Sequence, residues 1–169
     1  MNKCVFLDRD GVLNCEIGDY AFRPDHFVVV DGVGEALKAL KAKGYLLIVA
    51  TNQAGISKGL YTDEDVMVCH GILQEACGGL IDDIYYCPYH PSISESLCRK
   101  PDSLMFEKAI AKYRIDPRLS WMIGDAERDM IPARKLGLRT VQVGTEQFET
   151  ADYIAADIRE AAQIILREG

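Results

Sequence analysis

The stretch Cys4-Val5-Phe6-Leu7-Asp8-Arg9-Asp10-Gly11 places two acids directly after a compact apolar run. Residues 4–7 show no polar alternation, which is typical of a strand buried on both faces of a parallel sheet. Gly11 would let the chain turn sharply away from that strand. We therefore expect Asp8 and Asp10 at the carboxyl end of a buried strand, where open α/β sheets bind their ligands.

The same pattern continues along the chain. Further apolar runs predict strands at residues 45–50, 81–86, 121–123 and 138–143. Apolar residues at helical spacing predict helices at residues 32–43, 62–78, 104–113, 126–136 and 158–166. Pro132 predicts a kink in the fourth helix or a later start. Because strands and helices alternate throughout, we expect one α/β domain over residues 1–169, Rossmann-like and three-layered, with a mainly parallel sheet.

Composition excludes several classes of protein. The chain has 19 Lys and Arg against 26 Asp and Glu, a net charge of −7, which argues against a nucleic-acid partner. No segment approaches the roughly 18 consecutive apolar residues of a membrane span. The start Met1-Asn2-Lys3 does not resemble a secretory signal, and the six cysteines are irregularly spaced. We expect a cytoplasmic monomer with reduced thiols and no membrane partner.

Polar residues follow the other predicted strands as well. Thr51-Asn52-Gln53 follows the second strand, Arg99 and Lys100 lie in the loop after the third, and Gly124-Asp125 follows the fourth. Asp129 comes four residues later. All of these groups should meet at one edge of the sheet.

Three acids at one edge, Asp8, Asp10 and Asp125, would repel one another unless a cation lay among them, and oxygen ligands favour Mg²⁺. A carboxylate beside Mg²⁺ can attack phosphorus as a nucleophile. The Thr51 hydroxyl and the Lys100 ammonium could hold the phosphate oxygens. The pattern indicates a phosphatase for a small phosphorylated metabolite.

These four groups of residues resemble, in order and spacing, the four motifs of the haloacid dehalogenase (HAD) superfamily phosphatases, over residues 3 to about 145. More narrowly, Phe6–Gly11, Thr51–Ile56 and Cys98–Pro101 are similar to the branch of histidinol-phosphatases and D-glycero-D-manno-heptose 1,7-bisphosphate phosphatases. The gaps after the first and third strands are loop-sized, so we expect no large cap domain.

The resemblance implies a role for each site residue. Asp8 would be the nucleophile and Asp10 the general acid and base. Mg²⁺ would bind Asp8, Asp125 and the backbone carbonyl of Asp10. The other expected roles are phosphate binding by Thr51 and Lys100, substrate contact by Asn52 and Arg99, a specificity loop containing Glu16 and Asp19, and orientation of Lys100 or a metal-bound water by Asp129. From the residues alone, Arg99 fits a surface ion pair equally well.

One departure concerns a structural zinc. The branch commonly binds zinc through a Cys-x-His pair and a Cys-x-Cys pair in the loop after the third strand. Cys87 and Cys98 keep two of these positions, but Tyr89 and Ser96 replace the other two, and His90 lies one residue off. Because structural zinc takes four ligands, we expect none here, and a loop held by packing and its prolines.

The substrate has several candidates. The segment Tyr85–Pro91 and the stand-alone domain favour the heptose bisphosphate, with hydrolysis of its 7-phosphate. Histidinol phosphate or another small phosphosugar is the alternative within the branch. A phosphotransferase or mutase would use the same Asp8 chemistry with an acceptor other than water.

Overall fold

A six-stranded sheet forms the centre of the molecule in the computed structural model, which describes residues 1–169. The strand order is β3-β2-β1-β4-β5-β6, and every neighbouring pair is parallel. The strands are β1 (Lys3–Leu7), β2 (Tyr45–Asn52), β3 (Asp83–Cys87), β4 (Trp121–Gly124), β5 (Arg139–Val143) and β6 (Tyr153–Ala155). The predicted parallel α/β fold is confirmed.

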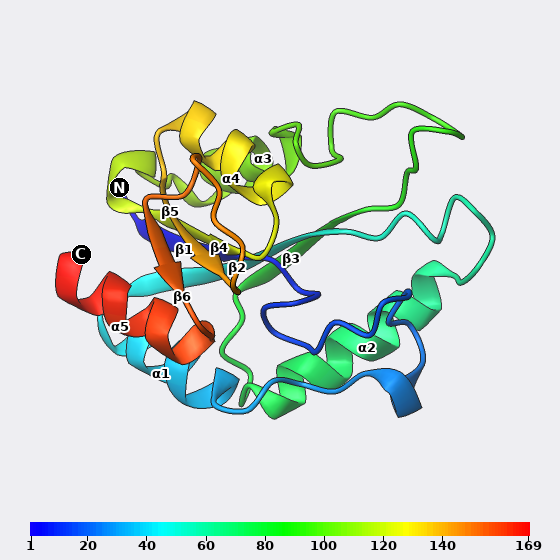
Figure 1. Ribbon diagram of the computed structural model, residues 1–169, viewed down its shortest axis with the longest axis horizontal. Helices are drawn as coiled ribbons and strands as arrows, with labels where there is room; N and C mark the ends of the chain where they lie inside the picture. The colour runs from blue at the N-terminus through cyan, green and yellow to red at the C-terminus, as the bar shows by residue number, and fades with distance from the viewer.

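Helices cover both faces of the sheet and complete the three layers (Figure 1). On one face lie α1 (Val33–Ala42), α2 (Asp63–Ala76) and α5 (Ile158–Glu168); on the other lie α3 (Leu104–Tyr113) and α4 (Glu127–Leu136). Successive β1 side chains point to opposite faces, so Val5 and Leu7 join one apolar core and Cys4 and Phe6 the other. Burial on both faces explains the unbroken apolar run in β1.

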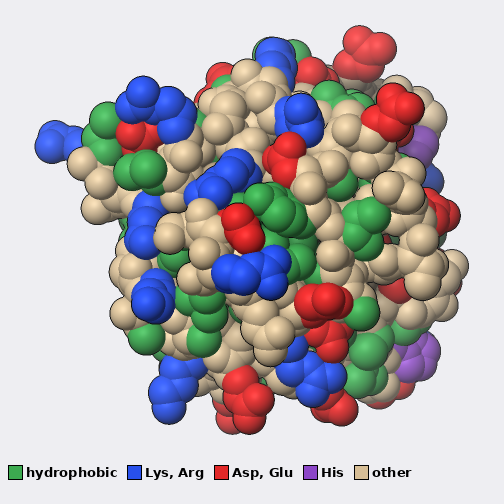
Figure 2. Space-filling view, turned by 60° about the vertical axis from the view of Figure 1, so that its left-hand side comes forward, with side chains coloured by type: hydrophobic (Ala, Val, Ile, Leu, Met, Phe, Trp, Pro, Cys, Tyr) green, Lys and Arg blue, Asp and Glu red, His purple; other side chains and the backbone are tan.

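The longest connections between these elements follow β1, over residues 8–32, and β3, over residues 88–103. Two single 3₁₀ turns, Pro24–His26 and Pro117–Leu119, are the only further helical segments. The connections after β1 and β3 contain no inserted domain, as expected. None of the helices combines the length and the apolar character that crossing a membrane requires. Figure 2 shows charged side chains of both signs scattered over one face of the molecule.

The structure differs from the predicted elements in a few places. Strand β6 is not predicted by the sequence, because its three residues are too few to show a period, and it lies at the sheet edge against β5. Strand β3 begins at Asp83, two residues after the predicted start at Ile81. Helix α4 starts at Glu127, five residues before Pro132, so the proline does not shift the start of the helix to its own position.

The sheet order determines where the site lies. β1 is flanked by β2 and β4, and all three run in the same direction. The residues that follow them, Asp8, Thr51 at the end of β2 and Asp125, therefore meet at one edge. Asp8 is tied to this edge by its backbone N–H, which donates to the Ile123 carbonyl of β4 at 2.9 Å.

Candidate active site

Asp8, Lys100 and Asp129 form a buried charge cluster at the carboxyl edge of the sheet. Lys100 Nζ lies 2.9 Å from Asp8 Oδ1 and 2.6 Å from Asp129 Oδ1, and it donates to the Ala50 carbonyl at 2.7 Å. Its three donors match these three acceptors. The Lys100 side chain is fully buried. Lys100 therefore fixes the carboxylate of Asp8 and is itself fixed by Asp129.

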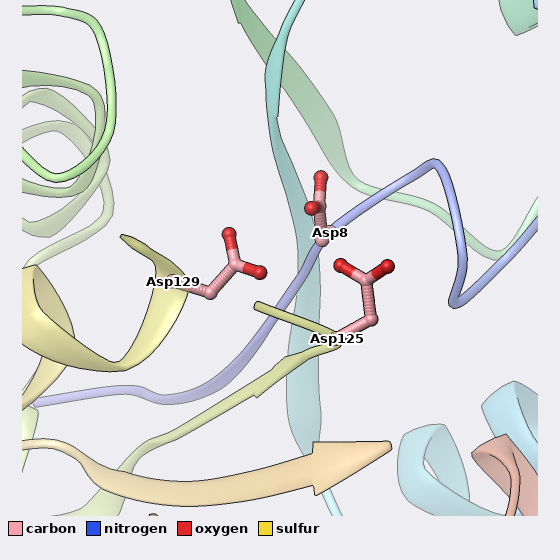
Figure 3. A group of neighbouring side chains, drawn as sticks. All are labelled: Asp8, Asp125 and Asp129. Atoms are coloured by element: carbon pink, nitrogen blue, oxygen red, sulfur yellow. The ribbon is translucent and has the colours of Figure 1, made fainter. Parts of the chain in front are cut away.

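Asp125 completes a group of three carboxylates. One oxygen each from Asp8, Asp125 and Asp129 lie within 4.8 Å of one another, and the three side chains converge from the end of β1, the end of β4 and the start of α4 (Figure 3). Asp129 Oδ2 also accepts from the Ala126 backbone N–H at 3.1 Å. Asp129 is thus occupied by protein donors, and its expected role of orienting Lys100 or a metal-bound water stays a prediction.

The cluster has the features of a site for a hard cation. Asp125 Oδ1 is buried and has no hydrogen-bond partner in the protein. Gly11 has a φ of +81°, and a β-carbon there would overlap the Asp125 carboxylate. Glycine is therefore required for the close approach of the two loops. An orphaned carboxylate oxygen beside two further carboxylates fits Mg²⁺, which takes oxygen ligands.

The electrostatics of the cluster favour a bound cation. Burial, reinforced by Asp129 and opposed by Lys100, raises the pKa of Asp8 to about 8. Burial and Asp129 also raise the pKa of Asp125 to about 6. Burial alone would lower the pKa of Lys100, but Asp129 and Asp8 outweigh it, so the pKa is raised. A cation beside the two carboxyls would therefore favour their ionised forms.

Asp10 lies beside the cluster with both carboxylate oxygens engaged. Oδ1 accepts from Arg9 at 2.8 Å and from Asn14 Nδ2 at 3.0 Å, and Oδ2 accepts from Gln53 Nε2 at 3.0 Å. The group of carboxylates that the structure brings together contains Asp129 and not the Asp10 side chain. Metal binding through the Asp10 carbonyl, as expected from the resemblance, stays a prediction.

Thr51 and Asn52 end β2 next to these acids. Thr51 is buried, and its hydroxyl accepts a hydrogen bond from Gln53 Nε2 at 3.0 Å. Asn52 makes a reciprocal pair with the Lys100 backbone, at 3.1 Å to the carbonyl and 3.0 Å from the N–H. Asn52 therefore holds the Lys100 segment in place, while its contact with substrate stays a prediction.

A cavity of about 360 Å³ opens beside Asp10. Arg99 and Arg128 contribute to its wall, and Arg128 lowers the pKa of Arg99 in addition to the effect of burial. The predicted specificity residues Glu16 and Asp19 also line this cavity. Arg99 has no acidic partner within salt-bridge distance and donates to the Tyr89 carbonyl at 3.3 Å, so the surface ion pair is not formed.

Comparisons with known proteins agree with this geometry. The HAD-hydrolase-like family matches residues 97–166. The D-glycero-β-D-manno-heptose-1,7-bisphosphate 7-phosphatase of Haemophilus ducreyi is 41% identical, over 89% of this chain and 87% of that protein. The enzyme of the same name from Pasteurella multocida is 36% identical, over 98% and 97%. The chain belongs to this family of HAD-type phosphatases.

A crystal structure also matches over almost the whole chain. It is the D,D-heptose 1,7-bisphosphate phosphatase from B. bronchiseptica complexed with magnesium and phosphate, with a TM-score of 0.89, 26% identity and 99% coverage of both chains. The expected HAD family, and within it the heptose bisphosphate phosphatase branch, is confirmed.

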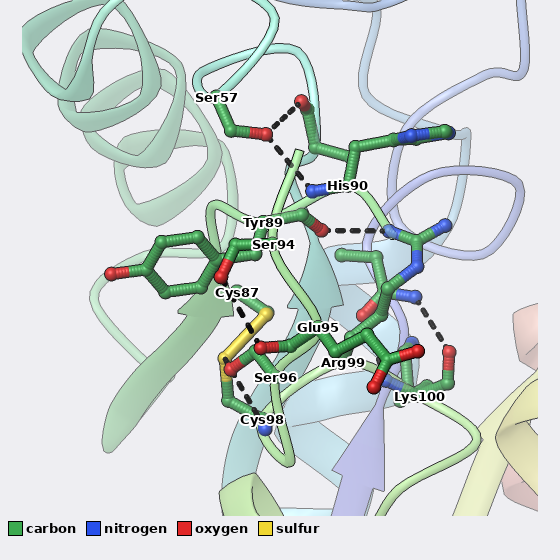
Figure 4. Close-up of a disulfide and its surroundings, with 12 residues drawn as sticks. Ser57, Cys87, Tyr89, His90, Ser94, Glu95, Ser96, Cys98, Arg99 and Lys100 are labelled. Carbon is green, nitrogen blue, oxygen red and sulfur yellow. Dashed lines mark hydrogen bonds between the residues drawn. A yellow bond between two sulfur atoms is a disulfide. The ribbon is translucent and has the colours of Figure 1, made fainter. Parts of the chain in front are cut away.

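In this member of the heptose bisphosphate phosphatase family, the loop after β3 is not held by packing and prolines alone, contrary to the prediction from the sequence. Cys87 and Cys98 form a disulfide, with their α-carbons 5.5 Å apart (Figure 4). The expectation of six reduced thiols is therefore wrong for this pair, because the loop returns the chain to within disulfide range. The other four cysteines, Cys4, Cys15, Cys69 and Cys77, are free. The His90 ring lies away from the sulfurs in Figure 4; it accepts from the Ser92 backbone N–H, and the His90 backbone N–H donates to Ser57.

Several residues that the sequence does not single out help to build the site of this family member. Arg9 is buried, donates to Asp10 and to the Ala21 carbonyl at 2.8 Å, and lies over the Phe27 ring. Gln53 and Arg128 lie within the motifs, but the sequence assigns them no role. The one sequence feature that points to Arg9 and Gln53 as site residues is their position within two residues of a strand end. Their hydrogen-bond partners come from distant loops, which the sequence does not bring together.

Proposed function

We propose that this protein is a magnesium-dependent phosphomonoesterase that removes the 7-phosphate of D-glycero-D-manno-heptose 1,7-bisphosphate through an aspartyl-phosphate on Asp8. The observation that carries the proposal is the buried carboxylate of Asp8, held 2.9 Å from Lys100 beside a second acid, Asp10. A nucleophile, a cation and an acid–base group are all needed, because uncatalysed hydrolysis of phosphate monoesters is extremely slow.

Asp8 and Asp10 have different roles in the two chemical steps. An Asp8 oxygen bonds to phosphorus as the bond from phosphorus to the sugar oxygen breaks, and Asp10 gives its proton to that oxygen. Asp10 then takes a proton from a water whose oxygen bonds to phosphorus. The acyl–phosphate bond breaks, phosphate leaves and the Asp8 carboxylate is restored.

The remaining groups hold the phosphate and its charge. The Thr51 hydroxyl binds a phosphate oxygen, and Lys100 keeps Asp8 in line and reduces the charge of the site. Asp8, Asp125 and the Asp10 carbonyl would hold Mg²⁺, which supplies charge neutralisation at the phosphoryl group when bound. The B. bronchiseptica phosphatase, which was crystallised as a complex with magnesium and phosphate, supports this assignment.

Two cations in the cavity support a bisphosphate over histidinol phosphate. Arg99 and Arg128 line the same wall, where a second phosphate would gain charge-assisted hydrogen bonds. Histidinol phosphate carries an ammonium in place of that phosphate and offers the two guanidinium groups no second anion to bind. Glu16 and Asp19 line the same cavity and would contact sugar hydroxyls.

The test is a comparison of rates with purified protein and Mg²⁺ on the β anomer of heptose 1,7-bisphosphate and on histidinol phosphate. We expect kcat/KM to be higher for the bisphosphate. Arg128→Gln should raise KM for the bisphosphate about tenfold, since a charge-assisted contact is lost. Arg159→Gln, an exposed arginine paired with Asp157 outside the site, is the matched control. A clear preference for histidinol phosphate would contradict the substrate assignment.

We further propose that the enzyme is a cytoplasmic monomer. The four free thiols support the compartment, whereas the disulfide is unusual there. Light scattering measures the mass of the protein in solution, and cell fractionation locates its activity. A stable dimer, or activity outside the cytoplasm, would contradict these assignments.

A further inference from the structure

Gln53 lies between two groups of the proposed mechanism and contacts both. It is buried, with 2% of its surface exposed. Its Nε2 donates to Asp10 Oδ2 and to Thr51 Oγ1, each at 3.0 Å. We propose that Gln53 is a positioning residue that holds the Asp10 carboxyl and the Thr51 hydroxyl in their working orientations, and that Tyr61 holds Gln53. This inference rests on the proposed function.

The orientation of the Gln53 amide follows from its neighbours. The NH₂ end faces Asp10 Oδ2 and Thr51 Oγ1, and an amide nitrogen can only donate to these oxygens. The Tyr61 hydroxyl donates to Gln53 Oε1 at 2.9 Å, which satisfies the other end. Each polar atom of the amide thus has a partner, and a flip would place Oε1 against a carboxylate oxygen. The chain Tyr61–Gln53–Asp10 has one hydrogen-bonding arrangement.

Tyr61 is held in turn by its packing. A β-carbon at Gly55 would overlap the Tyr61 ring, so the ring can pass close to that backbone only because residue 55 is glycine. Phe22 also stacks on Tyr61 at 4.9 Å between ring centroids, and the Tyr20 ring lies at 5.6 Å. Tyr20 also lines the cavity beside Asp10. The loop expected to set specificity therefore supports the residue that fixes Gln53.

The contacts of Gln53 leave the reacting groups directed toward the site. Asp10 Oδ1 is held by Arg9 and Asn14, and Gln53 restrains Oδ2, so the plane of the carboxyl is set by donors at both oxygens. Thr51 Oγ1 accepts from Gln53, and its own hydrogen remains for a phosphate oxygen. Loss of the amide would leave Asp10 misplaced for proton transfer, while the substrate would still bind.

The experiment compares Gln53→Met and Tyr61→Phe with the whole wild-type protein in Mg²⁺. Two esters are used: heptose 1,7-bisphosphate, whose leaving oxygen needs a proton, and p-nitrophenyl phosphate, whose leaving group does not. We expect Gln53→Met to lower kcat/KM about 10- to 100-fold for the sugar ester and much less for the aryl ester. KM for the sugar ester should change much less than kcat, because Thr51 stays in β2 and keeps its own hydroxyl for the phosphate. Tyr61→Phe should also lower kcat/KM more for the sugar ester than for the aryl ester, but by a smaller factor.

A second readout follows from the role of Asp10 in the hydrolysis of the phosphoenzyme. With p-nitrophenyl phosphate, Gln53→Met should release a burst of nitrophenol, because formation of the aspartyl-phosphate is spared and its breakdown is slowed. A merely structural glutamine would lower both rates together without a burst.

Matched controls remove similar contacts outside the site. Gln74→Met deletes an amide that bonds the Ile81 backbone, and Tyr86→Phe deletes a hydroxyl that bonds Asp63. Both should keep wild-type rates on both esters. If Gln53→Met does not fold, as judged by circular dichroism, Tyr61→Phe decides the matter.

The outcomes separate the two claims. In one outcome, the wild type is active while Gln53→Met and Tyr61→Phe lower kcat/KM equally for both esters, or leave it unchanged. That result would overturn the role of Gln53 and leave the proposed function intact. A wild type that hydrolyses neither ester would overturn the proposed function itself.

Discussion

Replacement of Lys100 by methionine tests the buried charge cluster directly. Methionine keeps the apolar stem of the side chain and removes the ammonium. The Nζ atom that is lost lies 2.9 Å from Asp8 and 2.6 Å from Asp129, and the exposed fractions of the three side chains are 0%, 5% and 0%. The variant would therefore leave two carboxylates buried without their counter-charge.

The size of the effect follows from that burial. Removing one partner of a buried ion pair costs about 3–5 kcal/mol of unfolding free energy, since the other charge stays desolvated. For a chain of this size the loss corresponds to a fall in Tm of about 6–20 °C. The cost should be smaller at pH 5 than at pH 8, because the pKa of Asp8 is raised by burial and by Asp129, and a protonated carboxyl needs no counter-charge.

The assay is denaturant unfolding in EDTA at both pH values, followed by circular dichroism. Lys112→Met is the matched control, because Lys112 makes a similar contact of 2.8 Å with Asp83 but its side chain is 59% exposed. That variant should change stability far less. Adding Asp129→Asn to Lys100→Met should recover part of the loss. A cost for Lys100→Met equal to that of Lys112→Met, or one independent of pH, would refute the reasoning.

Three further predictions follow from the same cluster. Asp8→Asn should abolish turnover with little change in Tm, because Lys100 keeps its contact with Asp129 and no buried charge loses its last partner, whereas exposed Asp31→Asn should keep full activity; appreciable turnover by Asp8→Asn would contradict the covalent route. EDTA should abolish activity and Mg²⁺ restore it; unchanged rates in EDTA would indicate a metal-independent enzyme. The pKa values of Asp8, about 8, and of Asp125, about 6, lie above the ordinary 3.8 in the folded protein. The two carboxyl groups therefore contribute to the stability of the metal-free protein below pH 3.8, and this contribution is lost as the pH rises through 6 to 8. The rise in Tm on adding Mg²⁺ should therefore be larger at pH 8 than at pH 5, and thermal unfolding showing the opposite trend would contradict this.

The fold and the position of the site could be predicted because their signals are local. The run Cys4–Leu7 with Asp8 after it marks a buried strand and its functional end, and the same holds for Trp121–Gly124 and Asp125. Parallel strands then place these ends together without any knowledge of side-chain contacts.

The supporting contacts could not be predicted because they join loops that are distant in sequence. Arg9 looks like a solvated charge, yet it is buried by residues around Ala21 and Phe27. The role of Gln53 depends on Tyr61 reaching it over Gly55. The pairing of Cys87 with Cys98 depends on the path of the loop between them, which its irregular sequence does not specify.

The aspartyl-phosphate is the central claim, and mass spectrometry of the quenched enzyme tests it most directly. The enzyme is mixed with Mg²⁺ and heptose 1,7-bisphosphate, quenched in acid during turnover and digested with pepsin at low pH. We predict one added phosphoryl group on the peptide containing Asp8, and none in Asp8→Asn. A turning-over enzyme that carries no phosphoryl group on that peptide, or carries it on another residue, would contradict the account.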